Sequence, residues 1–312
     1  MIFRAALAAA ALAYAAPAVA APETSLREQL AALQALDARI QTAGWRLARG
    51  NARFCHAVAP GIGLQLFDAA GFADPAAARA ALGLAGDIAV EAVAAGGPAE
   101  RAGLQSGLAL SAVAGTEVAA LPAVEPNDYA RLVGLHDKLD AALAATGQVI
   151  FRDAVGTEHT AIGEPACVTR FEMLSKGTKA AADGKRVVIG RKLVEELDDE
   201  LLAAALAHEL AHNLLGHRAR LDTSGRSWIN VKATEREADR LMPWLLANGG
   251  YDPRAAGRFF AAWGPKHDLG VFSTPDHDGW KDRAHTVEAE VAHVERSRAR
   301  NGGAADWRKD FN

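Results

Sequence analysis

The segment LAAALAHELAHNLLGHRARL, residues 202–221, places three histidines and one glutamate in an otherwise apolar run. Its core, HELAH at positions 208–212, has the pattern HExxH. On a helix, residues four apart share one face, so both imidazoles can reach one metal ion. Glu209 is turned about 100° from His208 and can accept a proton from an attacking water. Neutral imidazole suits zinc, and burying these polar groups is costly unless a metal satisfies them.

A catalytic zinc site needs a third protein ligand and one position left for water. His217 lies five residues after His212, whereas the metzincin pattern needs six, so we expect His217 to pack or hydrogen-bond rather than ligate. In ATEREADRL, Glu235 and Asp239 are four residues apart and share a helix face. Glu235 is the candidate ligand, with a surface carboxylate as the alternative, and Asp239 can fix the outer nitrogen of a ligating histidine. Glu237 points to another face and is predicted to be a solvated charge.

The stretch DDELLAAALAHELAHNLLGH, followed by EREAD, resembles the zinc metallopeptidase family of HtpX and the CAAX-prenyl endopeptidases, which also has soluble periplasmic members. That family carries HExxH on one helix and ExxxD on a second. The resemblance covers about residues 168–296 and implies a mostly helical zincin-type domain with a small sheet at the cleft edge, in TKAAADGKRVVIGRKLVEEL. It implies one Zn²⁺ per chain and the following roles: ligands His208, His212 and Glu235, catalytic base Glu209, and supporting aspartate Asp239.

The end of the resembling region differs from the family pattern. The family often has Ser-Thr-His-Pro before an arginine, whereas this chain reads FSTPDHDGWKDRA. We interpret His277 and Arg283 as displaced equivalents and assign His277 a catalytic role. A loop histidine without a role in the site is the alternative.

The elements that must position these residues follow from local patterns. Ser25-Leu26-Arg27-Glu28 matches a capping box, and apolar residues follow at three- and four-residue steps. We therefore predict an amphipathic helix to about residue 49, within a segment 21–54 that packs on the catalytic domain. Residues 57–166 alternate glycine, proline and short apolar runs, as in a strand-rich domain. From 168 to 300 the pattern is helical, apart from a hairpin around Asp183-Gly184, and 301–312 is predicted to be a tail.

The middle segment, 55–167, resembles a PDZ domain through GGPAERAGLQSGLALSAVAGTEV. The loop Gly61-Ile62-Gly63-Leu64 resembles the loop that grips a peptide's terminal carboxylate, and a helix near 128–145 would flank the groove. A packing module that binds no peptide is the alternative. The fold class predicted overall is α+β, a helical protease domain with an inserted PDZ-like domain.

The N-terminus MIFRAALAAAALAYAAPAVAAPET reads as a signal peptide, 1–20, followed by a soluble exported chain without a membrane span. The two cysteines, Cys55 and Cys167, are candidates for a disulfide, with two buried free thiols as the alternative. We expect the bridge to join the ends of the PDZ-like domain. The localisation predicted is periplasmic or otherwise exported.

The charge pattern narrows the function further. The 312 residues carry a net charge of −4 without a basic stripe, so no nucleic-acid partner is expected. We predict a zinc-dependent endopeptidase that cuts polypeptides, in envelope protein quality control, with a peptide C-terminus as a candidate partner of the PDZ-like domain. The substrate is expected to lie extended along the RVVIG strand and to pair with it backbone to backbone. One alternative is a non-proteolytic zinc-containing quality-control or scaffold protein that holds client peptides. Another is a purely structural zinc site, which usually has four protein ligands.

Overall fold

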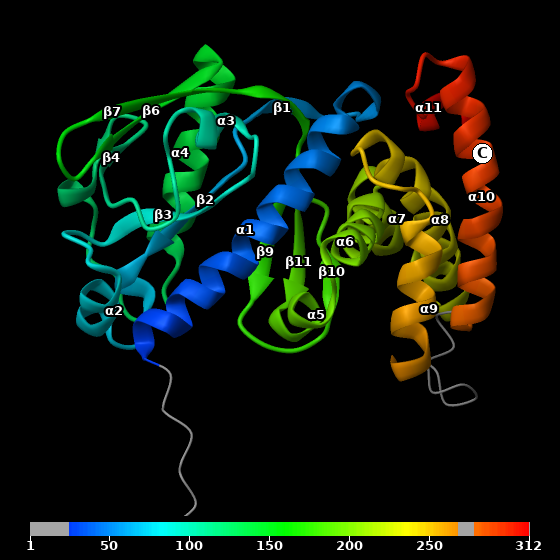
Figure 1. The fold of residues 1–312 in the computed structure, drawn as a ribbon, viewed down its shortest axis with the longest axis horizontal. Coiled ribbons are helices and arrows are strands. Elements are labelled where there is room, and N and C mark those ends of the chain that lie inside the picture. Colours follow the sequence, from blue (N-terminus) through cyan, green and yellow to red (C-terminus); the bar gives the residue numbers. More distant parts are fainter. Residues whose placement is uncertain (1–24, 268–277, 312) are drawn as a thin grey trace, which may run out of the picture.

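The computed structural model describes residues 25–267 and 278–311. The long helix α1 (Leu26–Gly50) runs diagonally between a strand-rich group of elements and a mostly helical group (Figure 1). The fold is therefore α+β, as the sequence predicts. The predicted signal peptide lies outside the described residues. Within the described part of the chain, no helix combines the length and apolar character that crossing a bilayer needs.

Helix α1 begins at the predicted capping box. The Glu28 N–H donates to Ser25 Oγ (3.3 Å), while the Glu28 carboxylate accepts the Ser25 N–H (2.8 Å). The second half of α1 is mostly buried, because both groups of elements pack against it. Gln41 Nε2 donates to the carbonyl of Phe171 in one group (2.7 Å) and to Gln65 Oε1 in the other (3.1 Å). Helix α1 thus connects the two groups.

The strand-rich group, residues 55–167, is called the inserted module below. Its strands are β1 (Val58–Gly61), β2 (Leu64–Asp68), β3 (Ile88–Val93), β4 (Leu110–Val113), β5 (Thr116–Glu117), β6 (Gln148–Asp153), β7 (Glu158–Ile162) and β8 (Glu164–Cys167). Its α-helices are α2 (Pro75–Leu82), α3 (Pro98–Arg101) and α4 (Ala130–Thr146). The strands form a sheet in the order β5-β4-β6-β7 and the pairs β2-β3 and β1-β8, all antiparallel. Helix α4 closes the core by burying Leu135, Leu139 and Leu143 in one cluster with Phe151.

The chain enters and leaves the inserted module at one place. β1 and β8 pair so that Val58 lies opposite Cys167, and a disulfide joins Cys167 to Cys55. This confirms the predicted bridge. An ion pair from Arg170, just beyond the module, to Asp137 on α4 (2.9 Å) adds a second link. The module is therefore fastened to the helical group at its base.

The helical group begins, in chain order, with a small sheet. It contains β9 (Arg170–Leu174), β10 (Ala180–Ala182) and β11 (Arg186–Gly190) in the order β10-β11-β9. β10 and β11 form the predicted hairpin, in which Asp183 Oδ1 accepts the N–H groups of Lys185 (2.9 Å) and Arg186 (2.7 Å). β11 also pairs in parallel with β9, so both of its edges are occupied. β10, whose outer edge has no strand beside it in the described sheet, is the strand available to a partner.

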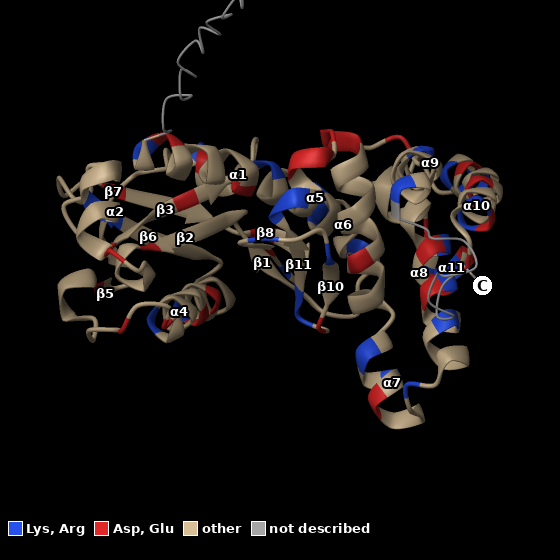
Figure 2. Ribbon diagram, turned by 90° about the horizontal axis from the view of Figure 1, so that it is seen from below, with Lys and Arg blue, Asp and Glu red and all other residues tan. Residues whose placement is uncertain are grey.

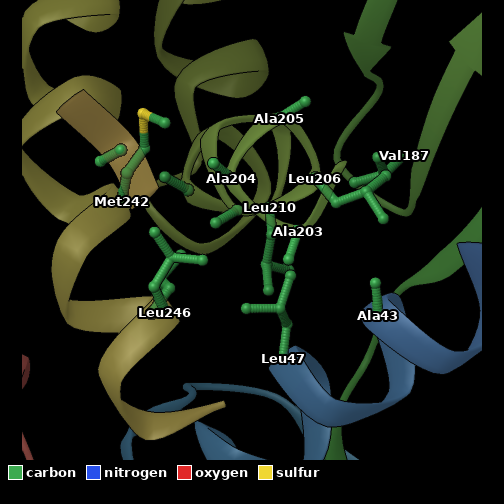
Figure 3. Packing of buried hydrophobic residues seen from close by; sticks show 14 of the residues in the cluster. Ala43, Leu47, Val187, Ala203, Ala204, Ala205, Leu206, Leu210, Met242 and Leu246 are labelled. Carbon is green, nitrogen blue, oxygen red and sulfur yellow. The ribbon is translucent and has the colours of Figure 1, made fainter. Parts of the chain in front are cut away.

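The rest of the helical group consists of α-helices, among which α6 packs against α7, α8 and α9. They are α5 (Arg191–Glu196), α6 (Asp199–Leu214), α7 (His217–Ser224), α8 (Trp228–Asn248), α9 (Ala255–His267), α10 (Trp280–Arg300) and α11 (Trp307–Asp310). Figure 3 shows side chains of α6 pointing toward Leu47 of α1, Val187 of β11 and Leu246 of α8, which belong to one buried cluster. Acidic and basic residues are interspersed along the outer helices, and α7 projects from the rest of the group (Figure 2). α6 is thus the central helix.

The segment 301–311, expected to be a tail, packs against the end of α1. Trp307 is buried and donates its Nε1 hydrogen to Asn51 Oδ1 (3.0 Å). Ser297 Oγ donates to Asp310 Oδ2 (2.6 Å), which ties the segment to α10. These contacts extend the helical core to the C-terminal residues.

Candidate metal centre

Helix α6 carries the HExxH pattern through the centre of the helical group. Asp198 caps the helix by accepting the Leu201 N–H (2.8 Å). Every residue from 202 to 211 is buried, and His208 and Glu209 are each only 9% exposed. A buried polar pair needs compensating partners, so the neighbours of these side chains decide what the site can do.

Helix α8 brings the second motif against α6. Ser227 caps α8 by accepting the Asn230 N–H (3.3 Å). Glu235 and Asp239 lie four residues apart on the face toward α6, and an oxygen of each lies within 3.3 Å of a His208 ring nitrogen. The shared helix face predicted for these two carboxylates is therefore present.

Three candidate ligand side chains converge between α6 and α8. The Nε2 atoms of His208 and His212 lie 3.1 Å apart. Glu235 Oε2 lies 3.3 Å from Nε2 of His208, and Glu235 Oε1 lies 3.3 Å from Nε2 of His212. A tetrahedral zinc ion with bonds of about 2.0–2.1 Å holds its ligand atoms about 3.3 Å apart. Across residues 25–267 and 278–311, this is the one group of three or more such side chains with ligand atoms within 4.8 Å of one another. The donor set and its spacing fit zinc.

Asp239 lies on the outer side of His208. Its Oδ1 is 3.0 Å from His208 Nδ1, and Arg283 of α10 donates to both carboxylate oxygens at 2.7 Å. Burial opposes ionisation of Asp239, but Arg283 and His208 hold its pKa below the usual value. Burial likewise opposes charge on His208, yet Asp239 and Glu235 raise its pKa to about 10. The carboxylates therefore favour positive charge here, which a metal cation can supply.

His212 has a different outer partner. Its Nδ1 lies 2.8 Å from Nδ1 of His217, and Nε2 of His217 lies 3.2 Å from Glu237 Oε2. Arg220 contacts the same oxygen at 2.9 Å. His217 thus hydrogen-bonds, as predicted. Glu237, predicted to be a solvated charge, is partly exposed but is also held by His217 and Arg220. Burial, with help from His208, lowers the pKa of His212 to about 3, so this imidazole is neutral, the form that binds metal.

A cleft of about 650 Å³ opens over the candidate ligands. Glu209 lines it together with all three of them. The small side chains of β10, Ala180 to Ala182, form part of one wall. Aromatic residues form another part: Phe259, Phe260, Trp263 and Trp280. The cleft therefore combines a strand edge, an apolar surface and a metal-binding cluster.

Residues 177–229, which hold this cleft edge and the HExxH helix, match the model of Peptidase family M48. The match confirms the resemblance to the zinc metallopeptidases of HtpX and the CAAX-prenyl endopeptidases over this segment. Glu235 and Asp239 lie beyond it, so their assignment depends on the distances above. Comparisons with curated proteins and with solved structures each found no match.

The remaining predictions for site residues concern His277, Arg283 and the loop at 61–64. His277 lies outside the described residues, whereas Arg283 reaches the centre through Asp239. The predicted peptide-binding loop lies in the inserted module, where Ile62 is buried and Gly63 packs against Trp45 of α1. The described cleft has no lining residue from positions 61–64. The structure therefore keeps the loop and the candidate metal centre apart.

Sequence reasoning missed the link from His212 through His217 to Glu237. A usable signal was Gly216, because a glycine directly before His217 indicates that the helix stops and the chain turns. The sequence also led us to place the substrate along RVVIG, the segment that forms β11. That interpretation is wrong, because β11 is paired on both sides and β10 forms the cleft edge.

Proposed function

We propose that this chain is a zinc-dependent endopeptidase that hydrolyses peptide bonds in proteins or protein fragments. The observation that carries the proposal is the convergence of His208, His212 and Glu235 in an open cleft that Glu209 also lines. Three protein ligands leave one position for water, as catalytic zinc sites require, whereas structural sites usually have four. The M48 match of residues 177–229 supports the same class of reaction.

In this proposal Glu209 acts as the general base. When bound, zinc would polarise the scissile carbonyl and lower the pKa of a nearby water. Glu209 takes the proton of the attacking water and then passes it to the nitrogen of the leaving amine. Asp239, held by two hydrogen bonds from Arg283, orients His208 from its outer side. His277 keeps a predicted role in the site.

The substrate proposed is an extended polypeptide on the outer edge of β10. Backbone groups of an edge strand can pair with an added strand, and alanine side chains let it approach closely. All three β10 residues line the cleft, so a peptide paired there passes beside Glu209. Phe259, Phe260 and Trp263 offer an apolar surface to substrate side chains. These features favour unfolded segments over folded surfaces.

The PDZ-like assignment of the inserted module stays part of the proposal. The loop 61–64 precedes β2, and α4 packs beside β2, which is the arrangement that a peptide groove needs. The Leu66 N–H on β2, however, donates to His136 Nε2 of α4 (3.3 Å), so a peptide that pairs at Leu66 must displace this ring. A packing module without a bound peptide is the alternative.

The proposed setting is an exported one, in envelope protein quality control. The buried disulfide between Cys55 and Cys167 supports this, because such bonds persist in oxidising compartments. The alternative function is a zinc-containing scaffold that holds client peptides without cutting them. Glu209 separates the two, since a scaffold has no use for a general base.

The test is Glu209→Gln, compared with wild type and with Glu195→Gln. Glu195 is an exposed carboxylate on α5, paired with Arg191, and serves as the matched control. Cleavage of an unfolded protein such as casein is measured with and without a chelator, and bound zinc is measured by metal analysis. We expect one zinc in all three proteins, and a loss of hydrolysis by several orders of magnitude in Glu209→Gln alone.

Two results would contradict the proposal. Cleavage by Glu209→Gln at nearly the wild-type rate would remove Glu209 from the mechanism. Wild-type protein that binds zinc but cleaves nothing, with or without added metal, would favour the scaffold.

A further inference from the structure

A line of hydrogen-bonded side chains runs from the candidate metal cluster to the protein surface. It starts at His212, continues through the His217 ring, whose side chain is 1% exposed, and ends at Glu237, whose side chain is 38% exposed. Arg220 of α7 closes the line by pairing with Glu237. None of the three residues beyond His212 belongs to the ligand cluster.

The contact between the two rings depends on a break in the helix. On a continuous helix, a residue five positions after His212 would be rotated about 140° from it and would point elsewhere. α6 instead ends at Leu214, and Gly216 adopts φ 65°. Glycine reaches this left-handed conformation without strain. α7 then starts at His217 and places its ring beside His212.

When His212 is a ligand, this arrangement allows only one assignment of hydrogens to the ring nitrogens of His212 and His217. Its Nε2 faces His208 and Glu235, so Nε2 gives its lone pair to the metal and Nδ1 carries the hydrogen. That hydrogen is donated to His217 Nδ1, which must therefore be an acceptor. The hydrogen of neutral His217 then lies on Nε2, where the Glu237 carboxylate accepts it.

The two histidine ligands are thus supported by different means. His208 has a carboxylate at its outer nitrogen, Asp239, which Arg283 holds. His212 has a neutral ring in that position, and the carboxylate stands one residue further out. A metal ligand whose outer nitrogen is fixed keeps one tautomer and one ring orientation.

We propose that His217 is a positioning residue for ligand His212, and that Glu237 acts through His217 by fixing its tautomer. This inference deepens the proposed function and rests on the zinc site it contains. His217 is not one of the three candidate ligands, and its Nδ1 meets the outer nitrogen of His212, so its effect is on how firmly the metal is held.

The experiment compares zinc binding by the full chain carrying His217→Phe, His217→Asn or Glu237→Ala. Phenylalanine fills a similar volume but offers no acceptor to His212. Asparagine places an oxygen where the histidine has Nδ1, so it can accept the same hydrogen. Zinc dissociation constants are measured by competition with a chromophoric chelator. The visible spectrum of Co²⁺ bound in place of zinc reports ligand geometry, and thermal unfolding checks the fold.

We expect His217→Phe to bind zinc roughly 10- to 100-fold more weakly than wild type and to change the Co²⁺ spectrum. His217→Asn should stay within about threefold of wild type, because the outer hydrogen bond is restored. Glu237→Ala, changed at the exposed end, should lose roughly 3- to 10-fold. His159→Phe is the matched control, since His159 is also hydrogen-bonded through both ring nitrogens but lies in the inserted module. It should not alter zinc binding.

Each remaining outcome overturns the inference. Wild-type affinity in folded His217→Phe would show that the hydrogen bond is dispensable, and equal losses in the Phe and Asn variants would show that only packing matters. If His217→Phe does not fold, Glu237→Ala decides. Wild-type zinc affinity together with a wild-type Co²⁺ spectrum in Glu237→Ala would contradict the inference. A wild-type chain that binds no zinc overturns the proposed function as well.

Discussion

Glu91→Gln should make the protein less sensitive to alkaline pH. Glu91 on β3 and Asp37 on α1 form a carboxyl pair where the inserted module packs against α1, and they are 8% and 6% exposed. Burial, with the neighbouring Asp37, raises the pKa of Glu91 to about 8, and burial raises that of Asp37 to about 6. Near neutral pH the pair therefore shares a proton.

The direction in which stability changes with pH follows from where this proton is held. The folded chain keeps a proton on the pair that the unfolded chain releases above about pH 4.5. The stability that the chain gains by holding this proton is therefore complete at acid pH, falls as the pH rises, and is lost above pH 8. Each unit by which a pKa is raised corresponds to about 1.4 kcal/mol. We expect wild type to lose about 2–4 kcal/mol between pH 5 and pH 9 that Glu91→Gln retains.

The assay is urea unfolding of wild type, Glu91→Gln and Glu195→Gln at pH 5, 7 and 9. The exposed Glu195 serves again as the matched control and should follow the wild-type pH dependence. Asp37→Asn should resemble Glu91→Gln, because it removes the other half of the pair. Parallel pH profiles for wild type and Glu91→Gln would refute the reasoning.

Two further predictions concern the ligand and the disulfide. Glu235→Ala should abolish stoichiometric zinc binding while leaving the fold intact, and metal analysis that still finds one zinc would move the third ligand elsewhere. Replacing Cys55 and Cys167 by serine should lower the free energy of unfolding by at most about 4–5 kcal/mol, from a sequence separation of 112 residues. Mass spectrometry of the unreduced wild-type protein should show the two cysteines linked, and free thiols at both would contradict the bridge.

The parts of the site that could be predicted depend on local geometry. His208, Glu209 and His212 lie within five residues on one helix, and the helical repeat alone sets their relative directions. Glu235 and Asp239 follow the same rule on a second helix. The start of α1 was also predictable, because the capping box between Ser25 and Glu28 is a contact over three residues.

The parts that escaped prediction depend on contacts between distant segments. The strand pair at the cleft edge was predicted, but the substrate was assigned to β11, and only the parallel pairing of β11 with β9 reveals that β10 is the outer strand. Three alanines carry no strand signal of their own, so β10 forms because the hairpin at Asp183 brings it beside β11. Asp37 lies on α1 and Glu91 on β3, and no sequence motif indicates that these two carboxyl groups meet.

The candidate ligands on α6 depend on helices that do not carry them. α8 supplies Asp239 to the outer side of His208, α10 supplies the arginine that holds this aspartate, and α7 supplies His217 to the outer side of His212. A buried helix tolerates these polar groups because each ring nitrogen that faces away from the cluster meets a polar atom of a neighbouring helix. The packing of three helices thus fixes where the two Nε2 atoms point. Changes that shift α7 or α10 should therefore weaken metal binding even when every ligand is present.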